Sequence, residues 1–368
     1  MLAFLFSLAL GEILIRLVAP QQLIVTNNRL WKPEPVFGWR HFESADTPVN
    51  TGERLTHLVT DEHGYRINRS LTKGEEAGKA DISILMIGDS FLEALAIENE
   101  ETIPQRIKQM LEAKYHKRVR AVNAGVGSWE PGQYWLEARR ALALAPYDLG
   151  IVFIYIENDI VDKVRTTFSH KEFEKNTTLR LPREWTWNSL ISAVFYPINF
   201  YLKQRSQLFV FLKERFNILL ARMRLTAYYF PVIFERKEKN SKRWEITADV
   251  CQKIQQEFEK YSTPVFFVFL PTDYQLDPSA LNEYIKMFDI SLQSVDLEQP
   301  DKMLALSFKK RYLDFIDTLV PMRERVRRGV KMHGQIDSHL NAEGHRAVAE
   351  IIFGEVEKYL PPQLKENH

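Results

Sequence analysis

The feature that most constrains the fold is an alternation of short apolar runs with amphipathic helical stretches, beginning at Asp81. The runs are nearly continuous in apolar residues, as expected for strands buried on both faces of a sheet. Strands are predicted at residues 82–87, 119–122, 151–156 and 264–270, with a shorter fifth at 290–297. Helices are predicted at residues 102–115, 132–145, 246–261 and 342–360. This alternation predicts an α/β fold in which helices cover both faces of a parallel sheet.

Composition excludes several classes of protein. The 368 residues are 45% hydrophobic, which is typical of a folded globular chain and not of a disordered one. Lys plus Arg number 49 and Asp plus Glu 48, so the net charge of +1 provides no overall field to attract nucleic acid. The single cysteine, Cys251, excludes an internal disulfide and argues against a zinc cluster.

The N-terminal segment, residues 1–20, is strongly apolar but contains Glu12 and Arg16. These charges make it a poor complete transmembrane helix, and Met1-Leu2-Ala3 lacks the basic start of a signal peptide. We interpret it as a membrane anchor, with an apolar helix docked on the domain as the alternative. The corresponding location is on a membrane, facing the periplasm or the cell exterior, and a cytoplasmic location stays open.

Two further segments stand apart from the alternation. Residues 21–80 contain many Gly and Pro and are predicted to form an irregular lead-in that wraps the domain. Residues 165–245 form a long insertion between the third and fourth strands. From Tyr201 to Arg243 the insertion has eleven Lys plus Arg against three Glu. It is predicted to include an amphipathic helix. The apolar face of this helix comprises Phe209, Leu212, Phe216, Leu219 and Met223. The other faces carry the basic residues Lys203, Arg205, Lys213, Arg215, Arg222 and Arg224.

We favour packing of this apolar face on the core, with the basic residues in solvent. The alternative is contact with a membrane surface or an anionic polymer.

Chemistry-bearing residues follow the predicted strands. The first strand ends in Gly88-Asp89-Ser90, the second leads into Gly127-Ser128, and the third into Asn158. Such residues at the carboxyl ends of buried strands are placed where α/β folds bind ligands, although Ser90 alone could simply cap a helix. Near the C-terminus comes Asp337-Ser338-His339. Serine catalysis requires a base, a group that orients the base, and donors to the oxyanion, and each has a candidate in these blocks.

These four blocks, in this order, resemble those of the SGNH subset of the GDSL hydrolases, a family of esterases, lipases and acyltransferases. The resemblance covers residues 81–158, resumes at 264–270 and returns at 337–350. It implies a flavodoxin-like three-layer sandwich with a parallel sheet of about five strands. The catalytic domain would then extend over residues 81–361, with the helical insertion between its third and fourth strands. The resemblance implies no cofactor and no metal.

The resemblance also implies roles for individual residues. Ser90 matches the nucleophile, His339 the general base and Asp337 the carboxylate that orients the base. The oxyanion hole would comprise the Ser90 N–H, the Asn158 amide and the backbone N–H of Gly127 or, one residue later, Ser128. This sequence departs from the family pattern at Glu157, where Gly is common, and at Asp337, which lies two residues before His339 instead of three. The shorter spacing resembles that in alginate O-acetylation proteins and related cell-envelope enzymes.

Two lead-in motifs also look like the segment preceding the catalytic block in bacterial envelope-associated members. They are residues 36–40, Val-Phe-Gly-Trp-Arg, and residues 61–66, Asp-Glu-His-Gly-Tyr-Arg. We expect them to pack as loops and assign them no catalytic role.

The resulting hypothesis is a serine esterase that removes acyl groups, expected to be acetyl, from a saccharide or a similar ester. The alternatives are an O-acyltransferase of an envelope polysaccharide and a catalytically silent domain that binds polysaccharide or acts as a scaffold. The spacing of His333, His339 and His345 could suggest a metal site but lacks a helical His-Glu-x-x-His pattern. The absence of Gly-x-Ser-x-Gly around Ser90 argues against the nucleophile-elbow hydrolases, and no phosphate-binding glycine motif is present.

Overall fold

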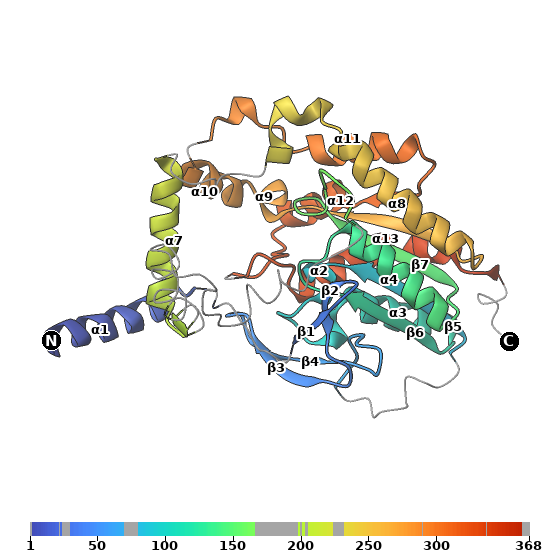
Figure 1. Ribbon diagram of the computed structural model, residues 1–368, viewed down its shortest axis with the longest axis horizontal. Helices are drawn as coiled ribbons and strands as arrows, with labels where there is room; N and C mark the ends of the chain where they lie inside the picture. The colour runs from blue at the N-terminus through green and yellow to red at the C-terminus, as the bar shows by residue number, and fades with distance from the viewer. Residues whose placement is uncertain are drawn as a thin grey trace.

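A computed structural model shows an α/β body from which two helices project at one end (Figure 1). It describes residues 2–21, 23, 30–69, 80–165, 198, 201–202, 205–223, 232–288, 290–335 and 337–362. Residues 70–79 of the predicted lead-in and residues 166–197 and 224–231 of the predicted insertion lie outside this set. Lys203 and Arg224, two of the basic residues noted in the insertion, also lie outside it.

The central sheet has five parallel strands in the order β6-β5-β7-β8-β9. The strands are β5 (Ile82–Gly88), β6 (Val119–Gly125), β7 (Leu149–Tyr155), β8 (Val265–Leu270) and β9 (Phe315–Asp317). In chain order this is 2-1-3-4-5, the strand order of flavodoxin-like sheets. The predicted fold class, a parallel sheet of about five strands between helical layers, is therefore confirmed.

The position of the fifth strand was predicted wrongly. Residues 290–297 contain a 3-10 turn at Leu292–Ser294 instead of a strand. Only some of its apolar side chains are buried, since Val295 lies in the core while Leu292 is exposed. The edge of the sheet is occupied by β9, whose Phe315 pairs with Phe267 of β8. A strand of three residues is too short to produce a recognisable apolar run.

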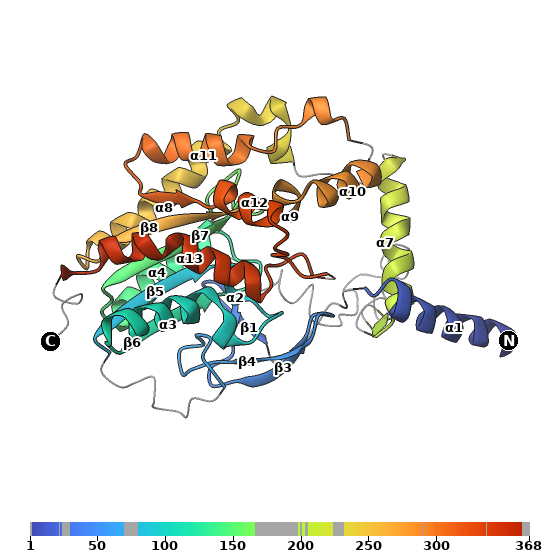
Figure 2. The same ribbon diagram turned by 180° about the vertical axis from the view of Figure 1, so that it is seen from behind.

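Helices cover both faces of the sheet, as Figures 1 and 2 show from opposite sides. One face is covered by α4 (Pro131–Leu144), α8 (Arg243–Glu259) and α11 (Gln299–Lys309). The other is covered by α3 (Ile103–Tyr115), α12 (Leu319–Arg327) and α13 (Ala342–Tyr359). Of these six, α3, α4, α8 and α13 were predicted to within a few residues. Short helices α2 (Ser90–Glu93) and α9 (Asp273–Leu276) and the longer α10 (Pro278–Phe288) follow strands β5 and β8.

The lead-in is more regular than predicted. It forms two antiparallel hairpins. Their strands are β1 (Trp31–Glu34), β2 (Gly38–His41), β3 (Asp46–Asn50) and β4 (Leu55–Val59). The Gly and Pro residues that suggested irregular chain include turn glycines such as Gly38 and Gly52, which have positive φ angles. Strand β3 alternates exposed and buried residues, so the hairpin of β3 and β4 buries one face.

Helices α1 (Leu2–Val18) and α7 (Gln207–Arg222) pack against each other and project from the body (Figures 1 and 2). Glu12 of α1 accepts hydrogen bonds from the backbone N–H groups of Gln207 and Leu208, at 3.0 Å each, at the start of α7. Arg16 donates to the carbonyl oxygen of Arg205 at 2.9 Å. The two helices are thus joined by polar contacts at one end.

The predicted apolar face of α7 does not pack on the sheet core, which corrects the interpretation favoured from the sequence. Leu212, Phe216, Leu219 and the following Met223 are all exposed. The reason is that α7 packs chiefly against α1 and α10. Among the described helices, none has both the length and the apolar character required to cross a membrane.

Candidate active site

The register of the sheet brings the predicted blocks together. Strands β5 and β6 are paired along their whole length, so that Gly88 lies opposite Gly125. Strand β7 pairs with β5 on the other side. Because parallel strands end at the same edge, the residues that follow β5, β6 and β7 meet there. The point where the chain order reverses, between β5 and β7, is where folds of this type bind ligands.

Asp89 holds the turn that carries Ser90. Its Oδ1 accepts a hydrogen bond from Phe91 N at 2.9 Å, and its Oδ2 accepts one from Asn158 Nδ2 at 3.0 Å. Burial raises the pKa of the Asp89 carboxyl, against these hydrogen bonds, which lower it. Asp89 therefore caps α2 and links the nucleophile turn to the end of β7.

The turn also packs directly on the end of β6. A Cβ atom at Gly125 would lie 2.4 Å from the backbone nitrogen of Glu93 in α2, so this position requires glycine. The close approach places Ser90 beside the loop that leaves β6.

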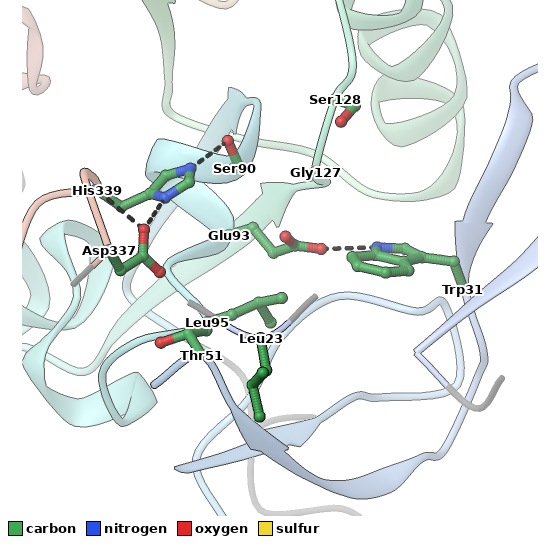
Figure 3. A pocket seen from close by; sticks show the side chains of 10 residues that line it. All are labelled: Leu23, Trp31, Thr51, Ser90, Glu93, Leu95, Gly127, Ser128, Asp337 and His339. Atoms are coloured by element: carbon green, nitrogen blue, oxygen red, sulfur yellow. Dashed lines mark hydrogen bonds and ion pairs between the residues drawn. The ribbon is translucent and has the colours of Figure 1, made fainter. Parts of the chain in front are cut away.

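Ser90, His339 and Asp337 form a connected chain of side chains (Figure 3). The Oγ of Ser90 lies 2.8 Å from Nε2 of His339. Nδ1 of the same ring pairs with Oδ1 of Asp337, which also accepts the His339 backbone N–H at 3.1 Å. The ring of Phe91 packs against the imidazole at 4.8 Å between centroids. These contacts fix the imidazole between an acidic residue and the serine hydroxyl, which is the geometry that serine nucleophiles require.

The electrostatic surroundings suit a base at His339. Burial acts to lower the pKa of His339, but the hydrogen bond and the charge of Asp337 outweigh it, and the pKa is raised above its usual value of 6.5. For Asp337, burial acts to raise the pKa, while the contacts with His339 lower it below 3.8. The carboxylate thus stays ionised beside the imidazole and stabilises its protonated form.

Three of the candidate oxyanion residues, Ser90, Gly127 and Ser128, line one cavity, whereas the fourth, Asn158, lies near it without lining it. Gly127 and Ser128 line a cavity of about 260 Å³ together with Ser90, His339 and Asp337. Within the described part of the chain, we find no acceptor for the N–H groups of Ser90, Gly127 and Ser128. Ser128 has a φ of 61°, so the loop turns sharply at this residue. Asn158 lies next to the nucleophile turn through Asp89 but is not among the residues that line the cavity.

Residues of the lead-in complete the cavity, and the sequence analysis assigned them no role. Leu23, Trp31 and Thr51 line it from the lead-in side, and Glu93 and Leu95 line it from α2 and the following turn. Glu53 accepts a hydrogen bond from Asp337 N at 2.9 Å, which ties the hairpin of β3 and β4 to the loop that carries His339.

The two lead-in motifs lie around the nucleophile turn. Trp39 donates from Nε1 to the carbonyl oxygen of Gly127. Arg66 is buried and donates from Nη1 to the carbonyl oxygens of Glu93 and Ala94, at 2.5 and 2.7 Å, and from Nη2 to that of Ile97, at 2.6 Å. It thereby holds the end of α2, while burial lowers its pKa to about 10. No signal in the sequence distinguishes Arg66 and His41 from the solvated polar residues that a segment rich in turns usually contains.

Of the other two histidines noted in this region, His345 is buried and His333 is partly buried. Burial lowers the pKa of His333 to about 4 and that of His345 to about 3. Nδ1 of His345 accepts the backbone N–H of Ile103 at 3.2 Å. In the ranges that the structure describes, His, Cys, Asp and Glu side chains form no group of three arranged to hold a metal ion.

The structure therefore combines a flavodoxin-like parallel α/β sheet with the motif blocks, at its edge, on which the sequence resembles the SGNH hydrolases. Searches of protein-family models and of curated proteins found no match. Among solved structures, the chain is similar to Axe2, an acetylxylan esterase from Geobacillus stearothermophilus, with 13% identity, a TM-score of 0.40, and coverage of 77% of this chain and 97% of that one.

Two further solved structures give similar values. TesA has 12% identity and a TM-score of 0.38, covering 76% of this chain and 99% of that one. The acetyl xylan esterase AlAXEase has 13% identity and a TM-score of 0.39, covering 75% of this chain and 100% of that one. These similarities concern the fold, and the chemistry proposed below rests on the side chains of this chain.

Proposed function

We propose that this protein is a serine esterase with Ser90 as nucleophile, His339 as general base and Asp337 as the residue that orients the base. The observation that carries the proposal is the connected pair of contacts from Ser90 Oγ to His339 Nε2 and from His339 Nδ1 to Asp337, in the wall of a cavity. No cofactor is needed for this chemistry, since the base, the nucleophile and the donors are protein groups.

The reaction proceeds in two transfers. Ser90 Oγ attacks the ester carbonyl carbon while His339 Nε2 accepts the hydroxyl proton, and the carbonyl oxygen becomes an oxyanion. The C–O bond to the leaving alcohol then breaks, and His339 returns the proton to that alcohol. Water, activated by the same imidazole, attacks the acyl-Ser90 ester and releases the carboxylic acid. Donors for the oxyanion are the N–H groups of Ser90 and of Gly127 or Ser128, together with the Asn158 amide.

The size of the cavity bears on the acyl group of the substrate. A volume of about 260 Å³ has room for a short acyl group such as acetyl, and is smaller than most pockets for drug-sized ligands. We propose an O-acetylated saccharide or a similar ester as the substrate. In an O-acyltransferase the same residues would pass the acyl group to a sugar hydroxyl instead of water.

The first experiment measures hydrolysis of 4-nitrophenyl acetate by the wild type, Ser90→Ala and His339→Ala. We expect both variants to lose at least about a thousandfold in kcat/KM with unchanged thermal unfolding. Equal rates in all three proteins would contradict the proposal. Labelling by a fluorophosphonate, seen in the wild type and absent in Ser90→Ala, would separate an enzyme from a silent scaffold. Free acetate measured with and without an acceptor sugar would separate a hydrolase from a transferase.

We also propose that α1 and α7 form a membrane-contact surface. Apolar side chains are exposed on both helices: Phe4, Leu5, Phe6, Leu8, Leu10, Ile13, Leu14, Leu17 and Val18 on α1, and Leu212, Phe216 and Leu219 on α7. The basic side chains of Lys213 and Arg215 are exposed on the same α7 helix. Apolar residues beside basic ones suit the boundary of an anionic lipid bilayer.

Sedimentation with phosphatidylglycerol vesicles tests this surface. The double variant Leu212→Ser and Phe216→Ser is expected to bind several-fold less than the wild type. A matched control changes two exposed leucines elsewhere, Leu144→Ser and Leu306→Ser, and is expected to bind like the wild type. Equal binding by all three proteins would contradict the proposed contact.

A further inference from the structure

A second carboxylate, Glu93, lies in the cavity beside the nucleophile. It is three residues after Ser90 in α2, its side chain is only 1% exposed, and it lines the same cavity. Figure 3 shows it between Ser90 and Trp31. A carboxylate buried at this depth needs partners, and those it has come from the lead-in.

Only one of its two oxygens is used by these partners. Oε1 accepts a hydrogen bond from Trp31 Nε1 at 2.8 Å and lies 2.6 Å from His41 Nε2. Oε2 is directed at Gly127, where a Cβ atom would lie 2.8 Å from it. The glycine leaves room for this oxygen at the cavity wall, next to the loop that carries the candidate oxyanion donors.

The pair of Glu93 and His41 holds a proton. Nδ1 of His41 lies 3.2 Å from the carbonyl oxygen of Gly64, which can only accept, so Nδ1 carries a hydrogen. The contact between Nε2 and Oε1 then needs a second hydrogen, supplied either as an imidazolium or as a carboxylic acid. Either way the pair is neutral as a unit. It therefore presents an acceptor oxygen at the cavity without placing a net negative charge beside the developing oxyanion.

We propose that Glu93 Oε2 accepts a hydrogen bond from a free hydroxyl group on the alcohol part of the ester, on the carbon adjacent to the one that bears the acylated oxygen. The proposal rests on the esterase function and defines its substrate as a partly acylated polyol or saccharide. Because the Glu93–His41 pair carries no net charge of its own, it offers an acceptor oxygen to a hydroxyl group without the ion pairing that would select an ammonium group. An ester without the hydroxyl would displace water from Oε2 and leave that oxygen unpaired, and sites built to bind a hydroxyl discriminate strongly against such substrates.

The test compares two esters that differ in one hydrogen-bond donor. 2-Hydroxyethyl acetate carries the hydroxyl, and 2-methoxyethyl acetate keeps the oxygen but cannot donate. We expect the wild type to prefer the first by about tenfold or more in kcat/KM. In Glu93→Gln the amide oxygen is held by Trp31, so that an NH2 group replaces the acceptor, and the preference is expected to fall to about onefold. The ratio of the kcat/KM values for the two esters, measured on one enzyme preparation, does not depend on the fraction of the enzyme that is folded.

A purely structural role for Glu93 predicts a different effect of Glu93→Gln on the ratio of the two rates. If it only tethers the lead-in to α2, Glu93→Gln lowers both rates equally and the preference persists, which would overturn the proposal. The matched control is Asp46→Asn, in the exposed acid–histidine pair with His57, which should keep the wild-type ratio. If the wild type hydrolyses both esters at equal rates, the proposed hydrogen bond to the substrate hydroxyl is overturned, while the proposed esterase function stands. No turnover of either ester, together with no fluorophosphonate labelling of Ser90, would overturn both.

Discussion

Trp39 Nε1 donates a hydrogen bond to the carbonyl oxygen of Gly127 across 2.9 Å. In return, Trp129 Nε1 donates to the carbonyl oxygen of Trp39 at 3.0 Å. These two bonds join the lead-in to the loop after β6, which carries the candidate oxyanion donors. The lead-in therefore supports the candidate active site and does not only cover the domain.

The first prediction concerns this tether. Trp39→Phe keeps an aromatic ring but removes the N–H that fixes the Gly127 carbonyl, so the loop donors should be less well oriented. We expect kcat to fall about tenfold with KM little changed, because the loop acts on the transition state, and the free energy of unfolding to fall by about 1 kcal/mol. Steady-state kinetics and urea unfolding measure both.

The matched control is Trp135→Phe. Its indole is also half-buried and donates to a carboxylate, Glu257, at 3.2 Å, but it lies on α4 and is not among the cavity residues. A similar loss of stability with wild-type kcat is expected there. Equal kcat in the two variants would show that the Trp39 bond has no part in catalysis.

The second prediction is a pH profile. The base must be neutral to accept the Ser90 proton, so kcat/KM should fall as the pH falls through the pKa of His339. This acidic limb should lie above pH 6.5, because Asp337 raises that pKa despite burial. In Asp337→Asn the raising influence is lost while burial remains, so the limb should move to lower pH and kcat should fall on the order of a thousandfold or more. A limb that stays in place would contradict the assigned role of Asp337.

The third prediction follows from the space at Gly127. In Gly127→Ala the new methyl group would lie 2.8 Å from Glu93 Oε2, so the carboxylate or the loop has to move. We expect kcat/KM to fall about tenfold to a hundredfold, since small displacements of donors are costly in catalysis. The control is Gly354→Ala on α13, where an added Cβ would meet nothing within 4 Å. If Gly127→Ala is as active as Gly354→Ala, the loop does not approach the reacting atoms.

The parts of the fold and of the candidate site that could be predicted are those whose pattern is contained in a short stretch of the sequence. Strands β5, β7 and β8 and helices α3, α4, α8 and α13 were predicted because their apolar patterns extend over many residues. Ser90 was predicted from a motif block at a strand end, and His339 and Asp337 from a block before the last helix, by resemblance to the family motifs. By contrast, β9 has three residues and leaves no pattern, so the fifth strand was placed at 290–297 instead.

The contributions of Trp39, His41, Glu53 and Arg66 were missed for a different reason. Each acts through a partner 27 or more residues away along the chain, such as Asp337 for Glu53. A polar residue in a segment rich in Gly and Pro is usually a solvated turn residue, and only the fold shows which ones are buried. The apolar face of α7 was likewise read as a core face, since periodicity shows that a face exists but not what it contacts.

The last prediction concerns Glu53, which we expect to be a positioning residue. Its Oε1 accepts the backbone N–H of Asp337, and a Cβ atom at Gly334 would lie 2.4 Å from the same oxygen, so the carboxylate fits closely inside the His339 loop. Glu53→Gln keeps an acceptor oxygen and should retain most activity. Glu53→Ala removes it, leaves the Asp337 N–H unpaired, and should lower kcat about tenfold or more.

The pH profile separates positioning from a general loss of stability. If Glu53 holds Asp337 against His339, Glu53→Ala should weaken that pairing and move the acidic limb of kcat/KM to lower pH, in the same direction as Asp337→Asn. A variant that is merely less stable would lose active enzyme at every pH without moving the limb. Rescue by Glu53→Gln, with both kcat and the limb close to wild type, would tie the effect to the acceptor oxygen. An unchanged limb in Glu53→Ala would show that the His339 loop is held without Glu53.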